Sequence, residues 1–255
     1  MINAASPRLS IYIFCWNEAR MLPWTLRFYR HHFPGSFITV YDNESDDGTA
    51  EIAKSNGCQL VSFSTSGHYD ELTLTKLRNT CWHGSATPWV LVVDCDELAS
   101  FTLEDLRAFE HLGFNVVRFE GYNMVTMMDD LSETSIDQVT HGARSSWYDK
   151  SLLFDRTAIT SINFSPGSHQ CNPRARFLKK ARVCSLGHKL YHFKYTSYSL
   201  LVERYLAVKT RSSRSNAENG LGYHYQLNAS DLLLEFRQVQ SSAVDLGGVF
   251  FGPDH

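Results

Sequence analysis

Hydrophobic and polar positions alternate regularly through the first half of the chain. Short apolar runs, rich in β-branched and aromatic residues, predict strands at residues 10–16, 37–41, 58–63, 89–93 and 115–119. Between these runs, apolar residues recur at helical spacing and predict helices at residues 18–32, 49–55, 69–83 and 103–112. Pro23 falls near the first turn of the first helix, where proline is tolerated, and Asn56-Gly57 is a usual stop for the second.

Strands that alternate with helices in this way predict right-handed β-α-β units and a mostly parallel sheet. Ligands of such sheets bind beyond the carboxyl ends of the strands. Three polar clusters directly follow predicted strands, namely Asn17-Glu18, Asp42-Asn43 and Asp94-Cys95-Asp96. We therefore expect these clusters to meet at one edge of the sheet.

The second half of the chain is less regular. A polar stretch at residues 122–146 is too long for a routine connection and is typical of a functional loop. Short strands are predicted at 151–154, 181–185 and 189–193, followed by a helix at 197–211, a loop at 212–222 and a helix at 230–239. No internal repeat or linker interrupts the chain, so we predict one α/β domain over residues 1–255. It comprises a mixed, mostly parallel sheet flanked by helices (9–120), a second part (121–195) and a helical C-terminal extension (196–255).

Composition and charge exclude several classes of protein. The chain of 255 residues is 43% hydrophobic and 20% charged, as ordinary globular proteins are. No apolar run approaches the ~18 residues of a membrane span, and the N-terminus lacks the pattern of a secretory signal. A net charge of −3 gives no general attraction for nucleic acid. The six cysteines form no C-x-x-C pair, so we expect reduced thiols and a cytoplasmic protein.

The acidic segment Asp94-Cys95-Asp96-Glu97 carries the strongest chemical signal. Two carboxylates two residues apart at the end of an aliphatic strand can share one divalent cation, and oxygen ligands of this kind suit Mg²⁺ or Mn²⁺ held jointly with substrate phosphates. Helix capping is the alternative interpretation. A second signal is the segment 42–49, whose acidic and amide groups can bind a ribose or a base edge or, alternatively, form an ordinary turn and N-cap.

Together these motifs resemble the GT-A nucleotide-sugar glycosyltransferases, and the family 2-like group in particular. The segments at 14–23, 41–49 and 94–97 match that group's N-E-x-x-x-L-P, D-N-x-S-x-D-G-T and D-x-D-E patterns in order and near the usual spacing. The match covers residues 9–100, and the later segment 190–197 is also similar. The resemblance implies a GT-A fold and a nucleoside-diphosphate sugar as donor.

The resemblance also implies roles for individual residues. Residues under or beside the nucleotide and its diphosphate would be Asn17, Glu18, Asp42, Asn43, Arg78, Asp94 and Lys194. Asp96 would ligate the metal directly, Asp94 through water, and His192 would complete the site, although a lone histidine in an aromatic strand is often structural. The basic stretch 174–182 is either a solvated edge or a surface for phosphate or an acidic acceptor.

The chain departs from the family pattern on the acceptor side. Many inverting members carry a Glu-Asp pair there whose aspartate is the general base, and no such pair follows residue 120. The candidate bases are therefore His169 first, in the Pro-Gly turn at 165–169, and then Asp149, Asp137 and Glu133. A general base must reach the proton of the acceptor hydroxyl and have a pKa suited to the working pH.

The resemblance implies metal-dependent transfer of a sugar from a nucleoside-diphosphate sugar to a hydroxyl of a glycan or glycoconjugate, with inversion at the anomeric carbon and Mn²⁺ or Mg²⁺ as cofactor. Four aromatic residues stand among polar neighbours in the sequence and suit either stacking on sugar rings or ordinary core packing, namely Trp147, Tyr148, Tyr223 and Tyr225. Three alternatives remain. The first is an inert sugar- or nucleotide-binding domain, which would retain the sheet. The second is a nucleotidyltransferase, which would need a glycine-rich phosphate loop near the first strand that this sequence lacks. The third is a phosphotransferase of the haloacid-dehalogenase kind, which would need the two aspartates near the N-terminus rather than at residue 94.

Overall fold

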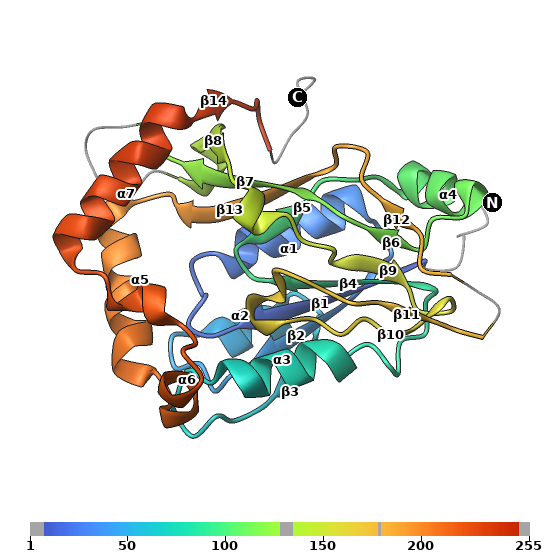
Figure 1. Cartoon of the computed structure of the whole chain (residues 1–255), viewed down its shortest axis with the longest axis horizontal. Coiled ribbons are helices and arrows are strands. Elements are labelled where there is room, and N and C mark those ends of the chain that lie inside the picture. The colour runs from blue at the N-terminus through green and yellow to red at the C-terminus, as the bar shows by residue number, and fades with distance from the viewer. Residues whose placement is uncertain (1–7, 128–134, 178–179, 250–255) are drawn as a thin grey trace.

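The computed structural model describes residues 8–127, 135–177 and 180–249 (Figure 1). Its main sheet has seven strands in the order β12-β6-β9-β4-β1-β2-β3. The strands are β1 Leu9–Cys15, β2 Phe37–Asp42, β3 Gln59–Ser62, β4 Trp89–Asp94, β6 Val116–Val117, β9 Leu153–Asp155 and β12 Val183–Cys184. Neighbours are parallel except in the two pairs that β9 makes. The predicted mixed, mostly parallel sheet is confirmed.

A second sheet of five strands brings distant parts of the chain to the acidic motif. Its order is β14-β8-β7-β13-β5. The strands are β5 Glu97–Ala99, β7 Glu120–Val125, β8 His141–Arg144, β13 Lys189–Tyr195 and β14 Val244–Asp245. Strand β5 follows the acidic motif directly and pairs antiparallel with β13, which places His192 opposite Glu97. Two further strands, β10 Ile159–Ser161 and β11 Arg174–Ala175, form a separate hairpin-like pair.

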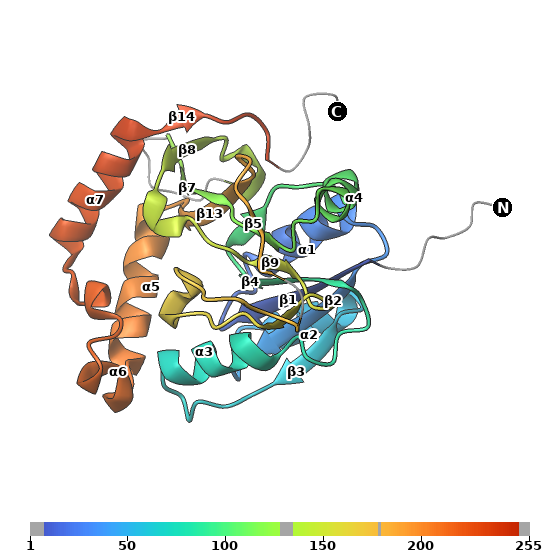
Figure 2. The same ribbon diagram turned by 45° about the vertical axis from the view of Figure 1, so that its right-hand side comes forward.

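Seven α-helices lie around the sheets in the described ranges. They are α1 Leu22–His32, α2 Thr49–Ser55, α3 Glu71–Thr80, α4 Leu103–Leu112, α5 Tyr198–Arg211, α6 Arg214–Glu218 and α7 Ala229–Ser242. Short 3-10 turns are η1 Ile136–Gln138, η2 Ser146–Tyr148, η3 Pro166–Ser168 and η4 Tyr223–Gln226. Figures 1 and 2 both show α5 and α7 standing side by side at one end of the molecule. None of the helices described is long and apolar enough to cross a bilayer.

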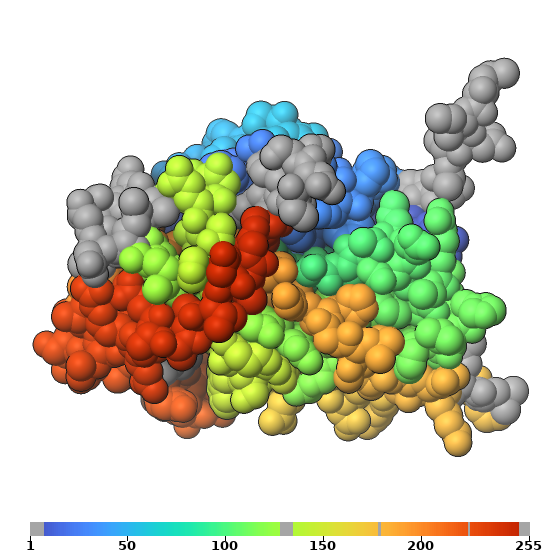
Figure 3. Space-filling view, turned by 90° about the horizontal axis from the view of Figure 1, so that it is seen from above, coloured from blue at the N-terminus to red at the C-terminus, as the bar shows by residue number. Residues whose placement is uncertain are grey.

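Helices α5 and α7 are attached to the second sheet by a hydrophobic cluster of their own. Its buried members are Val125, Tyr195, Leu201, Tyr205, Leu232 and Phe236. A larger cluster fills the space around the main sheet and includes the strands β1 and β4, whose side chains are almost entirely buried. Figure 3 shows α7 and β14 (red) lying against the segment around β8 (yellow-green), where β14 pairs with β8. The C-terminal helices therefore cover the edge of the second sheet.

Three predicted elements differ from the structure. The predicted loop at 212–222 contains helix α6, whose first turn is capped by the side chain of Ser213, which accepts the Asn216 N–H. The predicted loop at 122–146 contains the end of β7, the turn η1 and strand β8, because these polar strands form through pairing with β13 and with each other. Residues 128–134, and with them Glu133, lie outside the described residues. The predicted helix at 18–32 begins only at Leu22, because side-chain oxygens of Ser45, Asp47 and Thr49 accept the backbone N–H groups of residues 17–19.

Candidate functional site

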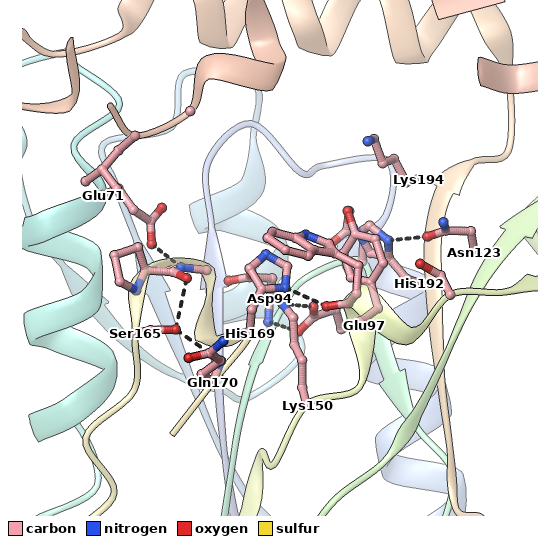
Figure 4. A pocket seen from close by; sticks show the side chains of 18 of the residues that line it. Glu71, Asp94, Glu97, Asn123, Lys150, Ser165, His169, Gln170, His192 and Lys194 are labelled. Atoms are coloured by element: carbon pink, nitrogen blue, oxygen red, sulfur yellow. Dashed lines mark hydrogen bonds and ion pairs between the residues drawn. The ribbon is translucent and has the colours of Figure 1, made fainter. Parts of the chain in front are cut away.

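A cavity of about 1150 Å³ opens at the carboxyl end of the main sheet. Its floor is the acidic motif at the end of β4, and its walls come from β13, α5 and the turns η2, η3 and η4. Figure 4 shows Asp94, Glu97, His169 and His192 together within it. The cavity is large enough for a nucleotide and a sugar, since small-molecule sites measure roughly 300–1,000 Å³.

The three carboxylates of the acidic motif each face a cation. Arg78 Nη2 lies 2.7 Å from Asp94 Oδ1. Desolvation raises the pKa of this partly buried carboxyl, but the charge of Arg78 outweighs it and the pKa lies below its usual value. Glu97 is 2.5 Å from Lys150 Nζ, and both side chains are almost fully buried. Burial raises the pKa of Glu97, an effect that Lys150 opposes. The helix-capping interpretation of this motif fails, because no helix begins at these residues.

Asp96 and His192 form a pair on the floor of the cavity. Asp96 Oδ2 is 3.4 Å from His192 Nε2, and both side chains are buried. His192 Nδ1 lies 3.0 Å from Asn123 Oδ1, which can accept its proton, and Nε2 is the ring nitrogen that faces Asp96. The ring of Tyr148 stacks on the imidazole at 4.1 Å. A histidine whose second nitrogen is fixed in this way has the arrangement usual for metal ligands.

The residues present fit a divalent cation that binds jointly with a ligand. Among the described residues, no group of three or more His, Cys, Asp or Glu side chains is arranged to hold a metal ion. Asp96 and His192 nevertheless present an oxygen and a nitrogen to one point, whereas Arg78 holds Asp94 away from a direct role. Mg²⁺ and Mn²⁺ sites commonly use one or two protein ligands and take the rest from phosphate and water. The pair can therefore hold such an ion together with a diphosphate.

Hydrogen bonds join Asn17 to the segment after β2, and these contacts lie beside the cavity rather than inside it. Asn17, with a left-handed φ of 51°, donates from Nδ2 to Asp46 Oδ1 at 2.7 Å and from its backbone to Ser45 Oγ at 2.9 Å. Asn43 Nδ2 donates to Thr65 Oγ1 at 2.9 Å. Neither asparagine lines the cavity. Both therefore act on the site by shaping the loops around it.

Asp42, which is buried, and Glu18, which is partly buried, are the carboxylates next to these contacts, and neither lines the cavity. Asp42 Oδ2 accepts from the Ser45 N–H at 3.2 Å, whereas Oδ1 is buried and has no hydrogen-bond partner in the described chain. Such an orphan acceptor is costly unless a ligand satisfies it. Glu18 Oε1 lies 3.0 Å from Arg204 Nη2. Burial raises the pKa of Glu18 to about 7, although Arg204 lowers it.

Glu71 joins the two sides of the cavity. Its Oε1 accepts from Arg78 Nη1 at 3.0 Å and from the Gly167 N–H at 2.6 Å, and its Oε2 accepts from Tyr69 O–H at 2.5 Å. The sequence reading missed Glu71, although it lies seven residues before Arg78 and so on the same face of α3. The acidic motif is thus connected through Arg78 and Glu71 to the turn that carries His169.

His169 lies in the cavity with a defined orientation. Its Nδ1 is 2.9 Å from the carbonyl oxygen of Trp147, so Nδ1–H donates and Nε2 is left as an acceptor. The Trp147 ring packs on the imidazole at 4.6 Å. Burial lowers the pKa of His169 to about 4, and the cation of Lys150 lowers it further in the same direction. The imidazole is therefore neutral near pH 7 with Nε2 open to a proton, and its low pKa makes it a weak base unless a bound ligand raises that pKa.

The other candidate bases lie elsewhere. Asp149 Oδ1 is held by Arg144 Nη1 at 2.7 Å and by the Gly121 N–H at 2.9 Å, and Asp149 does not line the cavity. Asp137 is in η1, where it accepts from the Ser135 hydroxyl, and it too is outside the lining. This placement favours His169 over both aspartates.

Lys194 lines the cavity, but the basic stretch does not. Lys194 Nζ is 3.6 Å from Glu235 Oε1 and lies over the Tyr205 ring at 4.9 Å; burial lowers its pKa. Within the stretch 174–182, none of the described residues lines the cavity, and Lys179 lies outside the described residues. The placement agrees with the solvated-edge interpretation. The sequence reading also missed Arg204 and Lys150, whose partners are 108 and 53 residues away.

Comparisons with known proteins find similarity in solved structures alone. No family model matches the chain, and no curated protein does. S. aureus TarS is similar over 90% of this chain and 43% of its own, with 13% identity and a TM-score of 0.43. The mannosyltransferase PcManGT from Pyrobaculum calidifontis, in complex with GDP-Man and Mn²⁺, is similar over 46% of this chain and 36% of its own, with 17% identity and a TM-score of 0.35.

A third similar structure is glucosyl-3-phosphoglycerate synthase from Mycobacterium tuberculosis, in complex with Mn²⁺, UDP and glucosyl-3-phosphoglycerate. It is similar over 64% of this chain and 62% of its own, with 14% identity and a TM-score of 0.39. The chain spans less than half the length of TarS and of PcManGT. At such identities and TM-scores, these similarities carry no activity or substrate over to this chain.

Proposed function

We propose that this chain transfers a sugar from a nucleoside-diphosphate sugar to a hydroxyl of a glycan or glycoconjugate, with Mn²⁺ or Mg²⁺ as cofactor. The observation that carries the proposal is the Asp96–His192 pair, at 3.4 Å and with Nδ1 of the histidine fixed by Asn123. It lies on the floor of a cavity at the carboxyl end of a mostly parallel sheet, beside an acidic motif and cationic side chains. The sequence motifs at 14–23, 41–49 and 94–97 point to the same chemistry.

Asp96 and His192 would hold the divalent cation. When bound, the metal supplies a Lewis acid that neutralises charge on the diphosphate leaving group. Arg78 and Lys194 line the same cavity and add fixed positive charge near that group. Asp42 does not line the cavity, but its buried Oδ1 has no hydrogen-bond partner in the described chain, and it would accept a hydrogen bond from the ribose or base if the loops beside the cavity rearrange on binding. Asn17, Glu18 and Asn43 hold the loops that frame this half.

His169 would act as the general base. Because Nδ1 donates to the Trp147 carbonyl, Nε2 is the nitrogen that takes the proton from the acceptor hydroxyl. The acceptor oxygen then attacks the anomeric carbon, the bond from that carbon to the diphosphate breaks, and the configuration inverts. The exposed rings of Trp147 and Tyr223 both line the cavity, where they offer apolar faces for sugar rings of the acceptor.

Nucleotide binding is the first test. Thermal unfolding is measured with UDP, GDP, dTDP, CDP and ADP, each with Mn²⁺ and with chelator, for the wild type, Asp96→Ala and Glu218→Gln. A ligand at about 100 times its Kd stabilises the folded state by about 2.7 kcal/mol, which raises Tm by several degrees. We expect one nucleotide to stabilise the wild type and the exposed-surface control Glu218→Gln in a metal-dependent way, and Asp96→Ala to lose the effect. No metal-dependent shift with any nucleotide would contradict the proposal.

Turnover separates a transferase from an inert binding domain. Release of the nucleoside diphosphate is measured from the UDP-sugar or GDP-sugar whose nucleotide gives the thermal shift. We expect His169→Ala to bind the nucleotide as the wild type does. Its kcat should be lower by roughly 10²-fold or more, which is the usual contribution of a general base. Binding without turnover in the wild type would favour the inert domain, and release of pyrophosphate from a nucleoside triphosphate would favour a nucleotidyltransferase.

A further inference from the structure

Arg204 bridges two acidic side chains at the point where the metal would bind. Its Nη1 lies 2.7 Å from Asp96 Oδ2, and its Nη2 lies 3.0 Å from Glu18 Oε1. The planar fork of a guanidinium suits such double contacts with carboxylates. Each of the two charges stabilises the other, since the charge of Asp96 raises the pKa of Arg204 and the charge of Arg204 lowers the pKa of Asp96. One side chain of α5 therefore neutralises acidic groups from two strand ends of the main sheet.

The guanidinium of Arg204 and the proposed metal ion would both bind the same oxygen of Asp96. The oxygen of Asp96 that faces His192 is Oδ2, and Oδ2 also accepts from Arg204. A divalent ion between Asp96 and His192 would share lone pairs with a hydrogen-bonded guanidinium and would be repelled by its charge. A carboxylate oxygen can accept a hydrogen bond and bind a metal ion together, but the positive charge of Arg204 then weakens the binding of the ion. Metal binding is therefore strengthened when Arg204 leaves Asp96.

Of the cations that pair with the acidic motif, Arg204 is the one placed to move. The side chains of Arg78 and Lys150 are only 7% and 3% exposed and are held by buried carboxylates. The side chain of Arg204 is 38% exposed and lines the open cavity. A diphosphate in that cavity would offer the guanidinium a new pair of oxygens with the same planar geometry. Arg204 can then exchange one anionic partner for another without becoming unpaired.

We propose that Arg204 is a displaceable counter-ion that makes metal binding and diphosphate binding cooperative. Without nucleotide, Arg204 occupies Asp96 and weakens the binding of Mn²⁺. With nucleotide, the diphosphate draws the guanidinium away, and Asp96 Oδ2 becomes available to the metal. Linkage requires the converse as well, so Mn²⁺ strengthens nucleotide binding by the same factor. This inference rests on the proposed function, because it assumes a metal and a diphosphate in this cavity.

The test measures binding of Mn²⁺ alone and with a nucleotide. Free Mn²⁺ is followed by electron paramagnetic resonance during titration of the wild type, Arg204→Gln, Arg204→Lys and Arg118→Gln, without nucleotide and with saturating UDP or GDP. Arg118 lines the same cavity but contacts Asp149 rather than the acidic motif, so its variant controls for loss of a positive charge. Arg204→Lys keeps the charge but cannot donate to both carboxylates through one planar fork.

We expect Arg204→Gln to bind Mn²⁺ alone at least 10-fold more tightly than the wild type. Nucleotide should strengthen Mn²⁺ binding at least 10-fold more in the wild type and in Arg118→Gln than in Arg204→Gln, which keeps only the coupling that the phosphate ligands of the metal supply. Arg204→Lys should lie between, and it serves in place of Arg204→Gln if that variant does not fold. Unchanged or weaker binding of Mn²⁺ by the Arg204 variants, or equal effects in Arg118→Gln, would overturn the proposal. If the wild type binds nucleotides without any metal dependence, the proposed function fails first.

Discussion

Charged side chains in this cavity form ion pairs. Among the described residues, the most buried of these pairs is Glu97 with Lys150. Their side chains are 2% and 3% exposed, at 2.5 Å from one another. We expect Lys150→Met to lower the free energy of unfolding by about 3–5 kcal/mol, because it leaves a buried carboxylate without a counter-ion. The loss should grow from pH 5 to pH 8, since burial already raises the pKa of Glu97 and the folded variant would keep a proton that the unfolded chain releases.

Urea unfolding at both pH values measures this loss. The matched control is the double variant Lys150→Met/Glu97→Leu, which removes both charges and fills the space with apolar atoms. It should recover most of the lost stability and show little dependence on pH. If the double variant is as unstable as the single one, packing of the lysine stem, rather than the uncompensated charge, sets the cost.

His169 predicts a pH dependence with the opposite sign. Its pKa is lowered to about 4 in the folded protein from an ordinary 6.5, with burial as the main cause. Between these values the unfolded chain binds the proton and the folded chain does not, so the folded state loses stability as the pH falls through this window. Between pH 7.5 and pH 5.0 we expect the Tm of the wild type to fall a few degrees further than that of His169→Gln. Parallel Tm profiles for the two proteins would contradict the lowered pKa.

At the scale of residues, the sequence predicted those that stand in local motifs and missed those that act across the fold. Asp94 and Asp96 end an apolar strand, and the structure places both in the cavity together with Arg78, His169, His192 and Lys194. Arg204 and Lys150 follow no motif, and their partners are brought near only by the pairing of distant strands and helices. Local sequence patterns could not predict their roles, because a salt bridge between two residues 108 positions apart produces no periodic pattern in the sequence.

Among the elements, helix α3 controls the position of the turn η3. Glu71, in the first turn of α3, accepts the Gly167 N–H and so ties η3, with His169 at its end, to the helix. We expect Glu71→Ala to destabilise the protein by roughly 3–5 kcal/mol, because Arg78 loses one of two buried partners. Amide hydrogen exchange in residues 165–170 should become faster by at least 10-fold, beyond the change elsewhere.

The N-cap of the same helix supplies the control. Asp70 accepts the Thr73 N–H at 2.8 Å, but it does not contact η3 in the described structure. Asp70→Ala should cost about 1 kcal/mol, as the loss of an N-cap does, and should leave exchange in residues 165–170 at the wild-type rate relative to the rest of the chain. Equal exchange in the two variants would show that η3 is held by other contacts.

Elements with local signals matched their predictions most closely. Helix α4 was predicted over its observed residues, because Thr102 and Asp105 form a capping box at its start and Gly113 takes a left-handed φ of 73° at its end. Strands β5 and β8 were missed, because one has three residues and the other is polar and is paired along both edges by distant strands. Local pattern specifies a capped helix but not a short strand that exists through its partners.

At the scale of the whole molecule, the main sheet and the C-terminal helices pack on different hydrophobic clusters. The cluster around Phe236 is separate from the large cluster around the main sheet, and it supplies the apolar contacts of α7 and of much of α5. Because Arg204 and Tyr205 come from α5, the wall of the cavity that α5 forms is packed on this smaller cluster. The prediction of one domain over residues 1–255 stays a prediction, and the cooperativity of unfolding tests it.

Phe236→Ala probes that division directly. Phe236 is fully buried, so truncation should cost about 3–5 kcal/mol through lost burial and a cavity. Because the smaller cluster holds few residues, we expect α5 and α7 to lose protection from hydrogen exchange by 10-fold or more beyond β1 and β4. Phe154→Ala, equally buried but in the large cluster, should instead speed exchange across the main sheet. Equal loss of protection in all four elements of the Phe236 variant would mean that the chain opens as one unit.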